Sequence, residues 1–356
     1  MNFNLKFLDK YQKVPAAAKI FLLQNISVML KAGISLSEAL KSLADQTKNR
    51  KLKNILLDVG EKIKGGGSFS ESMMPYQKDF GELFINMIRA GEASGRLEDV
   101  LMELYIQSKK DYTLVTKIRN ALTYPVIIII AMITIASIMA VFVLPSMIKM
   151  FDDMNVELPL VTRLLIMLSH FIQKDGIYVL IGAIILIIVF IRTIKSKTGK
   201  HLSDSLILKI PVISGIIKQI NLARASRSLS ALIQTEIAIV ETLTITSRVL
   251  GNSVYKLAFL DAAEKVKKGQ KLASIFKEYP DIFPSSVIQM ISVGEETGSL
   301  DNILKNLADF YEEEVTETMN NLPTIIEPVL MILIGIAVGG IAIAVLMPMY
   351  SLTQSM

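Results

Sequence analysis

The sequence contains no cysteine and only two histidines among its 356 residues. Without cysteine, the chain can form no disulfide bond, no thiolate metal site and no thiol nucleophile. No assembled set of metal ligands surrounds His170 or His201, so we expect both to be incidental. The catalytic patterns HExxH and GxSxG and the dinucleotide-binding fingerprint are absent as well. The sequence therefore predicts no catalytic, cofactor-binding or metal site, and no enzyme.

Charge is missing from long apolar stretches, although charged residues make up 20% of the chain. Two uncharged runs of 19 residues have nearly the length with which a helix crosses a bilayer core. A third run of 15 residues is too short alone, so we expect flanking residues to extend it, with Lys174 and Arg192 snorkelling. The long runs are 126–144 and 329–347, and the short one is 177–191. We therefore predict three transmembrane helices, at 126–146, 172–192 and 325–348.

Basic residues near these runs indicate how the chain is oriented. Eight of them lie before the first run or after the second: Lys109, Lys110, Lys117, Arg119, Arg192, Lys195, Lys197 and Lys200. The connection between those runs has three basic and four acidic residues, and no charge follows Met347. Since basic residues are retained on the cytoplasmic side, we predict cytoplasmic domains at 1–125 and 193–324, an outer loop at 147–171 and an outer tail at 349–356.

The net charge of +5 follows from this topology. Proteins that bind nucleic acid usually combine a basic patch with aromatic residues that stack on bases. The basic residues of this chain are not interleaved with aromatic ones. The sequence therefore predicts no nucleic-acid partner.

The two cytoplasmic regions are repeats of one another. Shifting the sequence by 203 positions aligns them without a gap, over about 130 residues. Identical pairs include Ser27 and Ser230, Glu38 and Glu241, Glu61 and Glu264, Phe80 and Phe283, Leu101 and Leu304, and the prolines Pro125 and Pro328. Each repeat is a polar helical domain followed by one membrane helix. Because like domains face the same compartment, two crossings must separate them, and the middle helix supplies the second.

Serine caps and glycines divide each repeat into helices. Ser35 with Glu38, and Ser68 with Glu71, have the spacing of a capping box at a helix start. Glycines at 65–67 end the helix between them. No stretch alternates polar and apolar residues convincingly, as a half-buried strand would. The sequence therefore predicts an all-α integral membrane protein, with two tandem homologous cytoplasmic helical bundles and three transmembrane helices.

A glycine-rich stretch occurs once in each repeat, as GEASGRL at 91–97 and as GEETGSL at 294–300. We call these stretches the first and the second corner. Their glycines are Gly91, Gly95, Gly294 and Gly298. The apolar spacing of 80–90 predicts a helix that ends at Gly91. We therefore expect a tight link between two helices, in which the glycines adopt positive φ.

The polar residues of the corners have two alternative roles. In a tight link, Ser94 and Thr297 would cap the following helix, and Glu92 and Glu295 would lie near its amino terminus. Alternatively, the corners face a partner, or bind a cation through Glu92, Glu295 and Glu296. A nucleotide-binding loop is excluded, because neither corner has the Lys-Ser/Thr pair that holds phosphates and magnesium.

Glu327 is the one acidic residue beside an apolar run. It precedes Pro328, and both residues suit the first turn of a helix. In the first repeat Tyr124 precedes Pro125, so the two repeats do not share this acidic residue. A functional role for Glu327 in the membrane is the alternative.

Two further pairs of residues are candidates for helix contacts. Gly335 and Gly339 form a GxxxG motif, which either lets membrane helices approach closely or reflects the ordinary glycine content of such helices. Arg224 and Arg227 lie one helical turn apart. We expect these arginines to face solvent or lipid headgroups, with an acidic partner as the alternative.

Five stretches together resemble one known family. They are AGISLSEAL at 32–40, AGEASGRLEDVL at 90–101, VLPSMIKMFDDMNVELPLVTRLL at 143–165, IPVISGIIKQINLARASRSLSALI at 210–233 and IIEPVLMILIGIAVGGIAIAVLMPMYSL at 325–352. In this order they resemble the platform protein of type II secretion and type IV pilus assembly, the GspF/PilC family. The departures are a short amino-terminal extension and Thr235-Glu236 in the place of Ala32-Gly33.

The resemblance implies a non-enzymatic scaffold in the inner (plasma) membrane. Its cytoplasmic bundles would engage a cytoplasmic secretion or pilus assembly ATPase, through a surface that includes both corners. Its membrane part would handle pilins or pseudopilins, together with other inner-membrane assembly components. We also expect a homo-oligomer embedded in membrane lipid. A small membrane transporter or permease component is the alternative function, since internal repeats are common in transporters.

Overall fold

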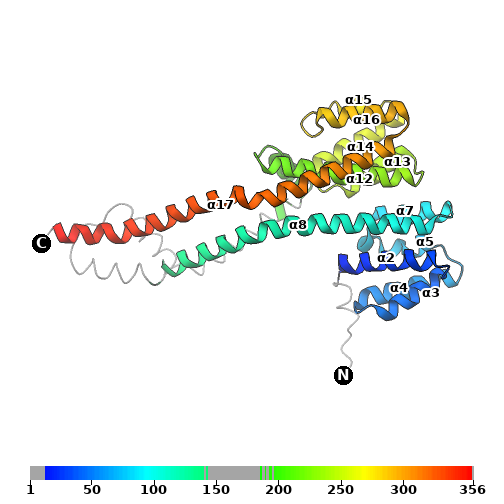
Figure 1. Cartoon of the computed structure of the whole chain (residues 1–356), viewed down its shortest axis with the longest axis horizontal. Coiled ribbons are helices and arrows are strands. Elements are labelled where there is room, and N and C mark those ends of the chain that lie inside the picture. Colours follow the sequence, from blue (N-terminus) through cyan, green and yellow to red (C-terminus); the bar gives the residue numbers. More distant parts are fainter. Residues whose placement is uncertain are drawn as a thin grey trace, which may run out of the picture. The chain divides into compact units, whose positions relative to one another are not determined.

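The structure is a computed structural model of the chain, and it describes residues 13–139, 142, 185, 186, 189, 192–194 and 196–354. All regular elements among these residues are helices (Figure 1). The prediction of an all-α protein is therefore confirmed for the described part of the chain. Two compact units are present, one formed by Met1–Thr116 with His201–Thr316 and the other by Lys117–Lys200 with Glu317–Met356.

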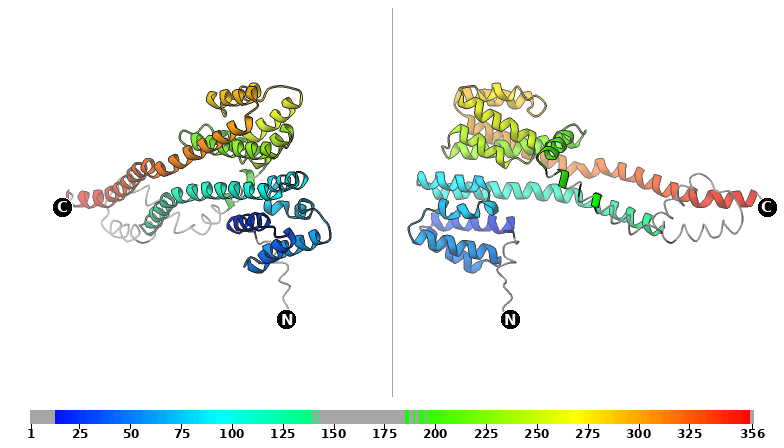
Figure 2. Two further views of the ribbon diagram at one scale, coloured as in Figure 1. Left: turned by 45° about the vertical axis from the view of Figure 1, so that its right-hand side comes forward. Right: turned by 180° about the vertical axis from the view of Figure 1, so that it is seen from behind.

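The two repeats share six helices in the same order. The first has α2 (Ala16–Lys31), α3 (Leu36–Gln46), α4 (Arg50–Lys64), α5 (Phe69–Met73), η1 (Met74–Tyr76), α6 (Gln77–Phe80), α7 (Glu82–Ala93) and α8 (Leu97–Ile138). The second has α11 (Lys197–Ile207), α12 (Ile213–Gln234), α13 (Ile239–Val249), α14 (Ser253–Lys267), α15 (Leu272–Phe276), α16 (Ser285–Thr297) and α17 (Leu300–Gln354). The first repeat thus also has η1 and α6 between the fourth and the fifth of the shared helices, and the second starts with a further helix, α11. α3 packs against α2 and α4, and α13 packs against α12 and α14 in the same way (Figures 1 and 2).

Polar caps start several of these helices. The hydroxyls of Ser35 and Ser68 each accept a hydrogen bond from the backbone N–H three residues later, at 3.3 Å and 3.2 Å. Both predicted serine caps are thus confirmed. Asn49 caps α4 in the same way at 2.8 Å, and its counterpart Asn252 caps α14 through the N–H two residues later at 2.9 Å. Asn49 thus separates α3 from α4, and Asn252 separates α13 from α14, divisions that the sequence did not predict.

Each repeat has its own hydrophobic core. In the second core, Tyr255, Phe259 and Phe276 are no more than 1% exposed. The rings of Phe276 and Phe283 stack with their centroids 4.1 Å apart. The first repeat has aliphatic side chains at the three equivalent positions: Leu52, Leu56 and Met73. At these three positions, large rings in the second core thus replace the smaller side chains of the first.

Two helices in the described part are long and apolar enough to cross a membrane, judged by length and composition. They are α8 and the Leu300–Gly340 part of α17. Their most apolar windows are only 6% and 11% buried within the chain, and Ile133 and Ile336 are 61% and 68% exposed. Apolar surface exposed to this extent is stable in lipid rather than in water. The described part of the chain therefore has the character of an all-α membrane protein.

Both helices continue through the prolines at which the membrane helices were predicted to begin. α8 contains Pro125 in its interior, and α17 passes through Glu327 and Pro328 without interruption. The prediction that Glu327 and Pro328 lie in the first turn of a helix is therefore wrong. A proline inside a helix removes one hydrogen bond, but a break at the membrane would leave several more backbone groups unpaired, which is costlier still.

Several membrane predictions fall wholly or partly outside the described residues. These are the outer loop at 147–171, His170 and most of the middle transmembrane helix at 172–192, of which Ile185, Leu186, Val189 and Arg192 are described as helical. The third transmembrane helix was predicted to end at 348, but α17 continues to Gln354. The count of three crossings stays a prediction.

We predict that Phe259→Ala lowers the free energy of unfolding of the second bundle by about 3–5 kcal/mol, because it leaves a large cavity in the core. Leu257→Ala, on the exposed side of the same helix α14, is the matched control and is expected to change it by less than about 0.5 kcal/mol. Leu257 is 53% exposed. Pulse proteolysis of the full chain in detergent, over a series of urea concentrations, measures both changes. Equal effects of the two variants would contradict the predicted core.

Candidate functional site

The first corner links α7 to α8, and the second links α16 to α17. Gly95 and Gly298 have φ of +69° and +67°, which confirms the predicted positive φ at these two glycines. Gly91 and Gly294 lie inside α7 and α16, which end two and three residues later. The prediction that the helix ends at Gly91 is therefore wrong. Gly81, with φ of +97°, also makes α7 start later than predicted.

Gly91 and Gly294 allow the two helices of each corner to approach closely. A Cβ atom at Gly91 would lie 2.9 Å from Val100 Cγ2 and 3.2 Å from Leu97 Cα, and one at Gly294 would lie 3.1 Å from Leu300 Cα. Carbon atoms in contact are normally about 3.5–4.0 Å apart. The carbonyl groups of the same two glycines accept the backbone N–H five residues later, at 2.8 Å and 3.0 Å, as in a Schellman motif. These glycines thus fix how the second helix of each corner leaves the first.

Ser94 and Thr297 bond to the helix that precedes each corner. The Ser94 hydroxyl donates to the carbonyl of Ala90 at 2.8 Å, and the Thr297 hydroxyl donates to the carbonyl of Val293 at 2.8 Å. The prediction that they cap the following helix is therefore wrong. Both side chains lie at the end of a helix, where the carbonyl four residues earlier is the nearest acceptor.

Glu92 and Glu295 cap two short helices within their own repeats. Glu295 accepts hydrogen bonds from the N–H groups of Leu272 at 2.6 Å and Ala273 at 2.9 Å, the first two residues of α15. Glu92 binds the first two N–H groups of α5 in the same way, at 2.9 Å for the second. A carboxylate at a helix amino terminus satisfies unpaired donors and opposes the positive end of the helix dipole. The glutamates were predicted near an amino terminus, but of the following helix rather than of α5 and α15.

Only one of the three candidate glutamates has its side chain available to a partner. Both carboxylate oxygens of Glu92 and of Glu295 are occupied by backbone N–H groups. Glu296 is exposed, and its contact in the chain is a 3.2 Å hydrogen bond from the Ser292 hydroxyl. Within the described ranges, no group of three or more His, Asp or Glu side chains is placed to hold a metal ion.

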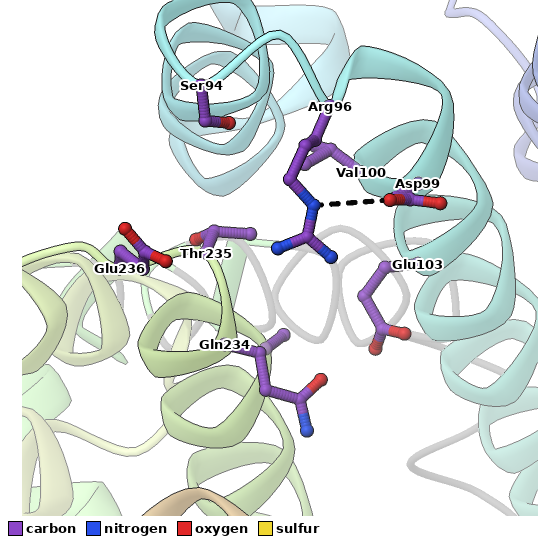
Figure 3. A pocket seen from close by; sticks show the side chains of 9 residues that line it. Ser94, Arg96, Asp99, Val100, Glu103, Gln234, Thr235 and Glu236 are labelled. Atoms are coloured by element: carbon purple, nitrogen blue, oxygen red, sulfur yellow. Dashed lines mark hydrogen bonds and ion pairs between the residues drawn. The ribbon is translucent and has the colours of Figure 1, made fainter.

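A pocket of about 170 Å³ lies between the first corner and the second repeat (Figure 3). Its lining residues are Ser94, Arg96, Asp99, Val100, Glu103, Ala231, Gln234, Thr235 and Glu236. The Arg96 side chain points into it from the start of α8, and its Nε is 3.3 Å from Asp99 Oδ2. Arg96 thus shares this pocket with Asp99 and Glu103 of the first repeat and with Glu236 of the second.

Glu236 adopts a backbone conformation that is unusual for a residue with a side chain. Its φ is +61°, and the equivalent residue of the first repeat is Gly33 with φ of +83°. A left-handed conformation costs a residue with Cβ about 1–2 kcal/mol. Both repeats therefore have the same left-handed turn at this position. Glutamate in place of glycine makes that turn less favourable in the second repeat.

Arg224 and Arg227 lie at the contact between the two repeats. Arg224 Nε is 2.8 Å from Asp111 Oδ1 of the first repeat. Arg227 pairs with Glu312, whose carboxylate is also 3.5 Å from Lys110 Nζ. The Arg227 side chain is 8% exposed, and burial lowers its pKa to about 10, which leaves it charged at neutral pH. The prediction that both arginines face solvent or headgroups is therefore wrong, because their acidic partners are in the same chain.

Apolar side chains complete this contact. Ala231, Leu232 and Ile245 of the second repeat belong to the core cluster of the first. Beside them α13 packs on α7, where Arg248 and Glu82 form an ion pair. None of these contacts was predicted. For the neighbouring pair of Arg227 with Glu312, the sequence did offer a signal, which is the run of three acidic residues at 312–314.

The GxxxG motif on α17 has open space around it as far as the described residues go. A Cβ atom added at Gly335 or Gly339 would meet none of their atoms within 4 Å. Close packing of another helix at this motif stays a prediction.

A family model described as "Type II secretion system (T2SS), protein F" matches the chain twice, at residues 22–145 and 225–348. The two matches start at residues 22 and 225, so they are offset by the same 203 positions as the internal repeat. The tandem repeat is thereby confirmed.

Curated relatives cover most of the chain. A type IV pilus assembly protein PilC of Thermus thermophilus is 36% identical over 92% of this chain and 81% of its own length. A PilC of Myxococcus xanthus is 32% identical over 92% and 79%. A type II secretion system protein F of Vibrio cholerae is 30% identical over 94% and 82%. The similarity thus extends through both repeats and the membrane segments.

We predict that Glu295→Ala lowers the free energy of unfolding of the second bundle by about 1–3 kcal/mol, because it leaves two backbone donors without their charged acceptor. Glu296→Ala, which changes the neighbouring exposed glutamate, is the control and is expected to have an effect below about 0.5 kcal/mol. Urea-dependent pulse proteolysis of the full chain in detergent gives both values. The capping role is excluded if Glu295→Ala proves as stable as Glu296→Ala.

Proposed function

Because the chain belongs to the family of type II secretion system protein F, we propose that it is the inner-membrane platform of a machine that assembles pili or pseudopili. The observation that carries this proposal is the double match of the family model, one match to each repeat. The relatives named above are components of pilus assembly and of type II secretion. Family membership favours this function over a small transporter.

The proposal includes a topology with both bundles in the cytoplasm and three membrane crossings. The basic residues that flank the first two apolar runs support this orientation. Two like bundles on one side of the membrane also require an even number of crossings between them. The amino terminus is then cytoplasmic, and the carboxyl terminus is outside.

The proposal also assigns the cytoplasmic bundles to a secretion-type ATPase, and the membrane helices to pilin-like subunits. Contact with an ATPase would couple nucleotide hydrolysis to the addition of these subunits. The corners support such a contact because each presents exposed polar side chains, among them Arg96 in the first and Glu296 in the second. Glu92 and Glu295 are unsuited to it, since their carboxylates hold α5 and α15.

The topology is tested by single cysteines, which the cysteine-free chain allows without background. A membrane-impermeant maleimide should label Ser355→Cys in intact spheroplasts. It should label Lys48→Cys and Lys256→Cys, one exposed site in each bundle, only after the membrane is permeabilised. Labelling of Lys256→Cys in intact spheroplasts would mean that the two bundles lie on opposite sides.

The partner assignment is tested by using the full-length protein in mild detergent as bait in a lysate of the native host. We expect the wild-type chain to retain a secretion-type ATPase, identified by mass spectrometry. The charge reversals Arg96→Glu and Glu296→Lys together should reduce the retained ATPase strongly. Lys48→Glu with Lys256→Glu, at exposed sites beyond the corners, is the matched control and should retain it.

Two outcomes of this pull-down have different meanings. If the corner variant retains as much ATPase as the wild type, then the ATPase binds elsewhere on the bundles. If the wild-type chain retains neither an ATPase nor any pilus or secretion component, then the platform function itself is contradicted.

A further inference from the structure

The contact between the two repeats joins two different faces of the same fold. The second repeat contributes the outer side of α12 and α13, which we call the donor face. The first repeat contributes α7 and the start of α8, which we call the acceptor face. Ion pairs of Arg224 with Asp111 and of Arg248 with Glu82 join the two faces. Since donor and acceptor differ, the contact is heterologous, and one face of each kind is left unused in the chain.

The unused donor face belongs to the first repeat and is apolar. Phe21, Val28 and Ile34, on and just after α2, are 49%, 55% and 37% exposed. Their counterparts 203 positions later belong to the donor face of the second repeat. The counterpart of Val28 is Ala231, which is 1% exposed because it packs into the first core. A position that is buried in one repeat is thus exposed, with a larger side chain, in the other.

The unused acceptor face belongs to the second repeat and is also apolar. Phe310 on α17 is 55% exposed, whereas its counterpart on the acceptor face of the first repeat, Gln107, is 8% exposed. Val293 on α16 is 46% exposed, and its counterpart Ala90 is half-buried. Both positions have a larger apolar side chain in the second repeat, whose acceptor face has no partner in the chain.

We propose that the donor face of the first repeat of one chain binds the acceptor face of the second repeat of a neighbouring chain. The contact would reproduce, between chains, the one that joins the repeats within each chain. A second copy of this chain is the occupant because its fold already covers the equivalent face. Each added chain leaves one donor and one acceptor free, so the chains associate head to tail.

The side chains on the two faces fit this arrangement. Within the chain, Arg224 and Gln107 line one pocket of the contact, together with apolar side chains such as Leu83. Their counterparts on the unused faces are Phe21 and Phe310, so an aromatic pair takes the place of a polar one.

Cysteine cross-linking of the full-length protein in native membranes tests the proposal. Asp45 and Ser285 are the counterparts of the ion-paired Arg248 and Glu82, and both are exposed. Asp45→Cys and Ser285→Cys are placed on separate chains with different tags and co-expressed. Under mild oxidation we expect a covalent dimer that carries both tags. Neither variant should form a dimer when expressed alone.

Three controls accompany this measurement. Glu82→Cys with Arg248→Cys on one chain should close within the chain, which checks the contact used as the template. Asp45→Cys with Lys271→Cys, an exposed site at the start of α15 outside the acceptor face, should not cross-link. Adding Phe310→Asp to the Ser285→Cys chain should lower the yield of mixed dimer about tenfold, as expected for loss of a central aromatic contact.

Several outcomes would overturn the proposal. The absence of mixed dimers, with the in-chain control closing normally, would mean that another molecule covers these faces. Dimers of Asp45→Cys alone, formed as readily as mixed ones, would show that like faces meet. An unchanged yield with Phe310→Asp would exclude the acceptor face. None of these results bears on whether the chain retains an ATPase, so the platform function is tested separately.

Discussion

The close approach of two helices at Gly91, and again at Gly294, is the constraint on which the rest of each bundle depends. A Cβ atom would lie 2.9 Å from Val100 Cγ2 at Gly91 and 3.1 Å from Leu300 Cα at Gly294, closer than ordinary carbon contacts. The second helix of each corner therefore leaves at a fixed direction, held by the backbone hydrogen bonds that close the turn. In the first repeat, α7 and α8 placed in this way form the surface on which the second repeat packs. The glutamate next to each glycine caps α5 or α15 from the same corner.

The repeats have kept their internal contacts and changed their outer ones. The glycine approach, the carboxylate cap and the asparagine caps are the same in both. At the surface, by contrast, Arg224 and Arg227 take the positions that Phe21 and Gln24 have in the first repeat. Arg224 pairs with Asp111 of the other repeat, whereas the buried Arg227 is neutralised by Glu312 of its own repeat. The charged contact within the chain is therefore specific to one orientation of the repeats.

Sequence patterns were sufficient where the determining interaction is local. The apolar runs, the serine caps at Ser35 and Ser68 and the positive φ of Gly95 depend on residues within a few positions. Prediction failed where the deciding partner is distant or where two local options compete. Glu92 binds a helix start 22 residues away, and Arg224 pairs with Asp111 across 113 residues. Ser94 had carbonyls and amides equally near in sequence, and only the helix geometry makes the carbonyl the acceptor.

The ends of the long helices show a third reason for failure. Prolines usually mark a helix boundary, yet α8 and α17 pass through them. Backbone groups in a bilayer have no water to bond with, so a continuous helix is favoured over a break. The bilayer environment, which the residues around each proline do not specify, therefore determines that these helices continue.

The contact between the repeats joins unlike faces, so the two bundles of one chain are not interchangeable. A back-to-back pair of identical domains would present two equivalent surfaces, related by a twofold axis. Here the first bundle leaves Phe21 and Val28 of α2 exposed, whereas the second leaves Val293 of α16 and Phe310 of α17 exposed. A partner that contacts both bundles therefore meets two different surfaces.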